Sequence, residues 1–167
     1  GQRLMLPEMK RVNAIWNHPL YQKNLKELQK LEKDRIFCRH TPEHFFDVAR
    51  LTWIYTLERG LDFSRETVYS AALLHDIGRA EQYARGTPHD VAGARIAEII
   101  LTDLDFAEED RKQILTAISE HRSSGTRTGS FSELLYEADK KSRNCFVCPA
   151  LAECNWAPEK KNMTIQY

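Results

Sequence analysis

Residues Ala71–Arg79 read AALLHDIGR, and this stretch decides the fold that we expect for the rest of the chain. Small and apolar residues without a charge run directly into His75 and Asp76, and Gly78 follows. The apolar part predicts a buried helix. An imidazole and a carboxylate both need partners when they are buried. The pair therefore predicts a counter-charge, a hydrogen-bond network or a metal ion beside it.

Helix start signals surround this stretch. Thr41-Pro42 combines an N-cap residue with a first-turn proline, and the helix that it opens ends at Gly60. Ser64 caps the next helix, which carries the His-Asp pair and is expected to end near Gly78. No strand-like alternation extends beyond a few residues. The sequence therefore predicts an all-α protein.

Further helices are expected on both sides of this central pair. Thr87-Pro88 repeats the start signal, with Asp90 placed to complete a capping box, and Ser130 with Glu133 forms another. Other helical segments are expected over residues 7–16, 19–37 and 107–121. We expect one domain with N-terminal helices over 1–40, a core over 41–143 and a cysteine-containing tail over 144–167 packed on that core.

The composition narrows the function classes. Lys plus Arg and Asp plus Glu both number 24, so the formal net charge is zero. This balance argues against electrostatic binding of a nucleic-acid polymer or a membrane over a broad surface. It does not exclude binding of a small anionic substrate. No apolar run is long enough to span a bilayer and no signal-peptide pattern is present, so we expect a cytoplasmic protein. The sequence does not decide whether the chain forms a homodimer.

Histidines and aspartates recur near helix ends or on apolar faces along the chain. Any one of them alone is more often a cap or surface residue than a ligand. Together, several convergent buried polar groups would be costly without a metal. Such N/O ligands suit Fe, Mn, Co, Ni or Zn. The candidates are His44, His75, Asp76, His89, His121 and Asp139.

This ordered set resembles the HD superfamily of metal-dependent phosphohydrolases. The resemblance runs from Thr41 to about Arg143, and its matching pieces are HFFDVA, AALLHDIGR, HDVAGARIA, AISEH and YEADK. It implies an HD-domain helical bundle in which one metal is held by His44, His75, Asp76 and Asp139. It also implies a second metal held by His89 and His121, with Asp76 bridging. The two extra histidines favour a dinuclear site like that of bacterial HD hydrolases acting on dinucleoside polyphosphates.

The resemblance also implies an activity. It predicts a phosphohydrolase that cleaves a phosphoester or phosphoanhydride of a nucleotide-like small molecule by metal-activated hydroxide. Arg79 is placed to act in catalysis and phosphate binding, and Arg122 and Arg127 are further phosphate-binding candidates. For the last two, solvated loop arginines are an equal alternative. His40 is expected in a supporting shell or as a proton carrier.

Two other functions stay open. The first is a di-iron oxygenase on the same fold, which the same ligand set suits. The second is a non-catalytic module that senses nucleotides or redox state.

The cysteines gather at one junction of the chain. Cys145, Cys148 and Cys154 follow the last ligand helix, and Cys38 precedes the first. Four thiolates suit a structural zinc or a [4Fe–4S] cluster. The alternative is four reduced thiols, with the tail folding through packing of its apolar residues.

Overall fold

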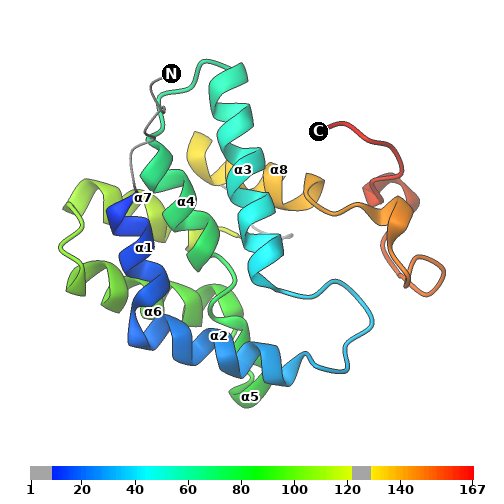
Figure 1. Ribbon diagram of the computed structural model, residues 1–167, viewed down its shortest axis with the longest axis horizontal. Helices are drawn as coiled ribbons and strands as arrows, with labels where there is room; N and C mark the ends of the chain where they lie inside the picture. The colour runs from blue at the N-terminus through cyan, green and yellow to red at the C-terminus, as the bar shows by residue number, and fades with distance from the viewer. Residues whose placement is uncertain (1–8, 122–128) are drawn as a thin grey trace, which may run out of the picture.

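The computed structural model describes residues 9–121 and 129–167, and every regular element in these ranges is helical (Figure 1). The all-α, single-domain prediction is confirmed. No helix in these ranges combines the length and apolar character that a membrane crossing requires. The helices are α1 (Lys10–Asn17), α2 (Pro19–Leu31), α3 (Pro42–Glu58), α4 (Arg65–Leu74), α5 (Arg79–Arg85), α6 (His89–Asp103), α7 (Glu108–Ser119) and α8 (Ser130–Lys141), followed by short 3₁₀ turns at Cys145–Val147 and Pro158–Lys160.

The core forms around α3 and α4, which stand side by side in the middle of the molecule (Figure 1). α3 also packs against α8, and α4 packs against α1 and α7. Helix α6 lies against α5 and α7. Burying each large apolar side chain in such a core contributes roughly 1.5–3 kcal/mol. Fully buried members include Phe45, Leu73, Leu74, Ile77, Ile100 and Ile118.

The His75-Asp76 pair lies in a turn rather than in a helix. α4 ends at Leu74, and α5 begins at Arg79. The prediction that the helix ends near Gly78 is therefore wrong by one turn. The cause is local: the ring Nδ1 of His75 binds the Ala72 carbonyl at 2.6 Å, and a continuing helix would use that carbonyl for a main-chain bond.

Several helix starts agree with the sequence prediction. The Thr41 hydroxyl accepts from the His44 amide at 3.3 Å, and the Ser64 hydroxyl accepts from the Thr67 amide at 3.1 Å. Each such cap is worth about 1 kcal/mol. The first of them binds the backbone amide of His44 and so anchors this residue in the first turn of α3.

Other boundaries differ from the prediction. α2 ends at Leu31 rather than near residue 37, because the next residue, Glu32, turns inward to bind His40. The predicted capping box at Ser130 is wrong, because that residue is already helical and its N-cap is Gly129. α6 begins after Pro88 without a side-chain cap, so Thr87 is not its N-cap. The short helix α5 was not predicted.

The segment after α8 is tied back to the core by its own hydrogen bonds. The Asn162 side-chain amide donates to the carbonyls of Lys140 and Arg143, at 2.8 Å each. The Tyr167 ring meets the Tyr55 ring of α3 edge-on, with ring centroids 5.1 Å apart. These contacts hold the C-terminal segment against the ends of α3 and α8.

Gly78 is the point where the turn meets α6. A Cβ at this position would run into the His89 carbonyl and the Gly93 amide nitrogen, and would lie 2.9 Å from the Gly93 Cα. These are backbone atoms, so they cannot rotate away. The absence of a side chain at Gly78 therefore sets the spacing between the His-Asp turn and the first turns of α6.

We expect Gly78→Ala to lower the free energy of unfolding by more than about 2 kcal/mol, because the overpacking falls on backbone. Urea unfolding monitored by circular dichroism measures this change. Gly129→Ala is the control, since nothing lies within 4 Å of a Cβ there and the loss of its N-cap glycine costs only about 1 kcal/mol. Equal stability of the two variants would contradict this expectation, because it would mean that the α6 backbone shifts to accommodate the added Cβ at little energetic cost.

Candidate metal centre

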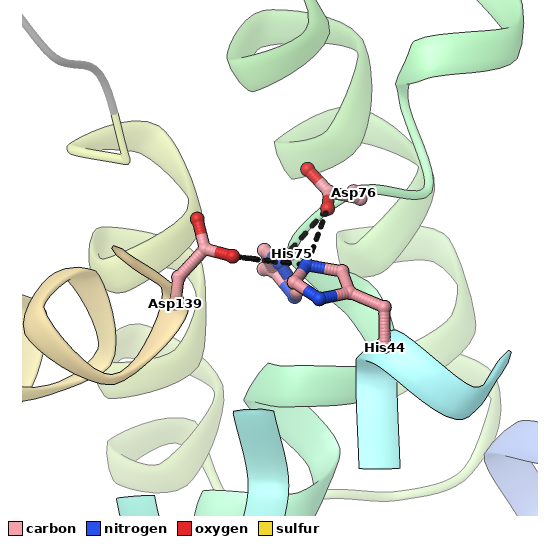
Figure 2. Close-up of side chains that lie close together, drawn as sticks. All are labelled: His44, His75, Asp76 and Asp139. Carbon is pink, nitrogen blue, oxygen red and sulfur yellow. Dashed lines mark ion pairs between the residues drawn. The ribbon is translucent and has the colours of Figure 1, made fainter. Parts of the chain in front are cut away.

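Four side chains from three parts of the fold meet in the interior. His44 comes from the first turn of α3, His75 and Asp76 from the turn after α4, and Asp139 from the last turn of α8 (Figure 2). One ligand atom from each lies within 4.8 Å of the other three. Within residues 9–121 and 129–167, no other group of His, Cys, Asp or Glu meets that distance with three or more members.

The shortest contacts in this group pair a histidine with a carboxylate. His75 Nε2 lies 2.9 Å from Asp76 Oδ2 and 3.6 Å from Asp139 Oδ1. His44 Nε2 lies 3.0 Å from Asp139 Oδ1 and 3.8 Å from Asp76 Oδ2. Neither Nε2 atom has a partner in hydrogen-bond geometry, although both are buried. The donor set of two imidazoles and two carboxylates fits a divalent transition metal.

Hydrogen bonds at the far side of each ring orient the two histidines. His75 Nδ1 donates to the Ala72 carbonyl at 2.6 Å. Ser142 Oγ donates to the Asp139 carbonyl at 2.7 Å, which leaves it to accept from His44 Nδ1 at 3.4 Å. With both Nδ1 atoms engaged, each Nε2 faces the group. Such outer partners are how proteins fix a metal-binding tautomer.

The charges of the group are strongly coupled. Burial alone would raise the pKa of Asp76, but His75 and Arg79 hold that pKa well below its usual range. Burial alone would lower the pKa of His75, but the nearby carboxylates of Asp76 and Asp139 raise it to about 10. A proton on His75 therefore offsets part of the negative charge of the two carboxylates, and a divalent cation bound there would displace it.

His89 stands at the start of α6 beside the group but outside it. Its Nδ1 and its backbone amide both donate to the Gln82 side-chain oxygen, at 2.8 and 3.0 Å. The other ring nitrogen, Nε2, is buried without a hydrogen-bond partner. Burial and the charge of Arg79 lower the pKa of His89 to about 4. The ring is thus a neutral imidazole with a free lone pair at neutral pH.

His121, directly after α7, contacts the group through one carboxylate. Its Nε2 donates to Asp139 Oδ2 at 2.7 Å, and its ring meets the His75 ring with centroids 5.0 Å apart. Its Nδ1 is buried and has no hydrogen-bond partner. The structure thus brings His121 to the Asp139 carboxylate rather than to Asp76.

Arg79 holds the second oxygen of Asp76. Its Nε donates to Asp76 Oδ1 at 2.9 Å, while Oδ2 faces His75. Since a bridging carboxylate offers one oxygen to each metal, a second ion at Oδ1 would have to displace this guanidinium. The four side chains thus form one compact group, and His89 and His121 are not members of it.

His40 is bound by a carboxylate outside the four-residue group. It is buried, and its Nδ1 lies 2.5 Å from Glu32 Oε2, while its amide donates to Glu32 Oε1 at 2.8 Å. The Tyr83 hydroxyl donates to the same carboxylate at 2.8 Å. Burial alone would raise the pKa of Glu32, but these bonds lower it to about 2. Neither Glu32 nor Tyr83 was singled out by the sequence.

A cavity of about 500 Å³ opens beside the group. His40, His44, Asp76 and Asp139 line it. Four cations also line it, namely Arg35, Arg79, Lys140 and Arg143. Of the arginines predicted to bind phosphate, Arg79 lies here, and Arg122 and Arg127 lie outside the described residues. Arg35 and Arg143 were not among the sequence candidates.

The four cysteines gather at a second cavity, of about 660 Å³, next to the first. All four are free thiols, and Cys145 is buried while the others are half-buried. Cys38, Cys148 and Cys154 line both cavities.

Comparison with known proteins connects this geometry to a family. A family model described as the HD domain matches residues 41–150. The chain is 43% identical to an uncharacterized protein of Clostridium beijerinckii, over 95% of this chain and 100% of that one. It is 30% identical to the ribonuclease Y of Oleidesulfovibrio alaskensis over 75% of this chain, but spans only 22% of that protein. The crystal structure of a predicted HD superfamily hydrolase from an uncultured Thermotogales bacterium superposes with a TM-score of 0.61, covering 90% of this chain and 86% of that one at 22% identity.

We expect Glu32→Gln to reduce the acid sensitivity of the fold. The pKa of Glu32 is about 2 in the folded protein against an ordinary value of 4.5, so only the unfolded chain takes up this proton between those values. The stability that the charge contributes is therefore present above about pH 4.5 and is lost as the pH falls toward 2.

Urea unfolding from neutral pH down to about pH 2 measures the effect. The stability difference between wild type and Glu32→Gln should shrink as the pH falls. Glu27→Gln, at an exposed position of α2, is the control and should show no such trend. A difference independent of pH would contradict the assignment.

Proposed function

The chain belongs to the HD-domain family, and from that premise we propose that it is a metal-dependent phosphohydrolase. Its proposed reaction is cleavage of a phosphoester or phosphoanhydride in a nucleotide-like small molecule. The observation that carries the proposal is the buried convergence of His44, His75, Asp76 and Asp139, with ligand atoms within 4.8 Å of one another.

The residues fit a divalent cation. Both Nε2 atoms face the group without hydrogen-bond partners, and the two carboxylates supply the negative charge that such an ion needs. A divalent ion held there would polarise a phosphoryl oxygen and lower the pKa of a water. The ordering of His44 by Ser142 and of His75 by Ala72 supports a ligand role for these two rings.

The cavity beside the group supports a phosphorylated substrate. Its volume of about 500 Å³ falls in the range of small-molecule sites. Arg35 and Arg143 on its wall are suited to phosphate oxygens, since guanidinium groups bind them in a bidentate manner, and the Lys140 ammonium adds positive charge. Arg79 already pairs with Asp76 and would bind phosphate through its remaining N–H groups. The relatives named ribonuclease Y make short RNA a necessary member of any substrate panel.

His40 is the proposed proton donor to the leaving group. It lines the same cavity as His44 and Asp76, and its ring centroid lies 6.4 Å from that of His44. Glu32 engages His40 Nδ1 and so leaves Nε2 as the nitrogen that exchanges a proton with substrate. The Tyr83 bond to Glu32 holds this carboxylate in place.

His89 and His121 are proposed to complete a second, weaker ion site. Each has a buried ring nitrogen without a hydrogen-bond partner, and each lies beside the four-residue group. Occupation of this site requires Arg79 to leave Asp76 Oδ1 and requires His121 to change its contact with Asp139. The second ion is therefore expected to bind with lower affinity than the first.

Metal-supplemented assays on phosphomonoesters, phosphodiesters, nucleotides, dinucleoside polyphosphates and short RNA test the activity. His75→Ala and Asp76→Asn should each lower kcat/KM by about 1,000-fold, because ligand loss removes several kcal/mol of transition-state stabilisation. Asp62→Asn, at an exposed position, is the matched control and should leave activity unchanged.

The same experiment distinguishes the hydrolase from the two alternative functions. Turnover that requires iron and O₂ would identify a di-iron oxygenase. Tight nucleotide binding by the metal-loaded protein without turnover of any substrate would identify a non-catalytic module. Either result would overturn the hydrolase proposal.

Metal titration with isothermal calorimetry tests the second ion. Wild type should bind one ion tightly and a second at least ten-fold more weakly. His89→Ala should abolish the weaker event and leave the tighter one, whereas His44→Ala should weaken the tighter event. His18→Ala, which changes a histidine that caps α2, serves as the control. A single binding event in wild type would mean that the site holds one ion.

A further inference from the structure

The four cysteines of the chain line one cavity although they come from two distant segments. Cys38 lies in the loop between α2 and α3, and Cys145, Cys148 and Cys154 lie after α8. Their cavity has a volume of about 660 Å³. None of them belongs to the His/Asp group, and the match to the HD-domain family ends at residue 150, before Cys154. The proposed hydrolase function does not use this cluster of thiols.

Backbone turns link the three C-terminal cysteines along the chain. The Cys148 amide donates to the Cys145 carbonyl at 3.1 Å, and the Leu151 amide donates to the Cys148 carbonyl at 3.2 Å. The Cys154 amide then donates to the Leu151 carbonyl at 3.4 Å. These turns keep the segment compact, and all three cysteines lie on the wall of the same cavity.

The surroundings of the thiols suit a negatively charged occupant. Four cations line the cavity and only one carboxylate does, that of Glu153. Two of the cations also fix the backbone around cysteines: Arg35 Nε donates to the Cys38 carbonyl at 2.8 Å, and Lys161 Nζ donates to the Cys154 carbonyl at 3.3 Å. The four cations are Arg35, Arg39, Arg143 and Lys161.

The distances between the sulfur atoms distinguish a zinc site from an iron–sulfur site. With Zn–S bonds of about 2.3 Å, a tetrahedral zinc holds its sulfurs roughly 3.8 Å apart. Among the described residues, the cysteines provide no group of three ligand atoms within 4.8 Å of one another. An iron–sulfur cluster places iron and sulfide atoms between the cysteines, so its thiolates stand further apart. A cube-shaped cluster also fills more of the cavity between the cysteines than a single zinc ion would.

We propose that Cys38, Cys145, Cys148 and Cys154 bind a [4Fe–4S] cluster that forms one wall of the metal-site cavity. Each cysteine gives up its thiol proton and forms one S–Fe bond. Four thiolates and the cluster core together carry a net negative charge, which the surrounding cations offset. The cluster ties the loop before α3 to the segment after α8.

The position of the cluster links it to the proposed hydrolase site. Cys38, Cys148 and Cys154 line the cavity that also contains His44 and Asp76. Loss of the cluster would release the wall that these cysteines form, and would leave the His/Asp group itself intact. This part of the inference rests on the proposed function, whereas cluster binding does not.

The test uses the full chain, purified without oxygen and supplied with iron salts, sulfide and a thiol reductant. We expect four acid-labile sulfides per chain and a visible absorption that dithionite bleaches. Sulfide is the deciding measurement, because iron at the His/Asp group brings none. His75→Ala with Asp76→Asn should therefore keep the full sulfide content while losing iron from that group.

Cys148→Ser and Cys154→Ser are the main variants, because these side chains are only half-buried and their replacement leaves the core intact. Each should reduce bound sulfide at least ten-fold without changing the helical circular dichroism. Zinc bound without sulfide would overturn the proposal, as would full sulfide content in either variant. Loss of sulfide with unchanged hydrolysis would support cluster binding and reject its link to the cavity.

Discussion

Two carboxylates held out of water govern the arrangement of this fold. Asp76 is 1% exposed, and the Asp139 side chain is 12% exposed. Such charges are costly unless partners surround them. Here the partners come from every neighbouring element: histidines from α3, from the α4–α5 turn and from the end of α7, and the guanidinium of Arg79. The helices must therefore converge at one point, and a divalent cation at that point satisfies the same requirement with fewer groups.

Much of this arrangement was predictable from the sequence. The Thr41 and Ser64 caps are local signals, and local signals depend on a few neighbouring side chains only. The convergence of His44, His75, Asp76 and Asp139 follows from the resemblance to the HD superfamily, and the family match now supports that fold. Periodicity alone did not predict where α4 ends, because the stop depends on a hydrogen bond from the His75 ring.

The remaining features depend on contacts between distant residues. Glu32 stands in a run of charged residues that reads as a solvated helix end, and only the return of the chain at His40 buries it. The sequence also does not predict that one oxygen of Asp76 faces His75 while the other binds Arg79. This arrangement leaves Asp76 Oδ1 bound to Arg79, whereas the dinuclear site that the resemblance implied needs this oxygen for a second ion. The position of Cys38 against the C-terminal cysteines likewise depends on the packing of α3 against α8.

The contact between His44 and Ser142 joins residues 98 positions apart, at the two ends of the helical core. Contacts of such long sequence separation are slow to form, because the intervening chain must be ordered first. During synthesis, the ribosome must therefore release α8 before the histidines of α3 and of the α4–α5 turn can meet their carboxylate. Until then the nascent chain lacks a completed binding pocket. Acquisition of metal is thus a late event that reports completion of the whole core.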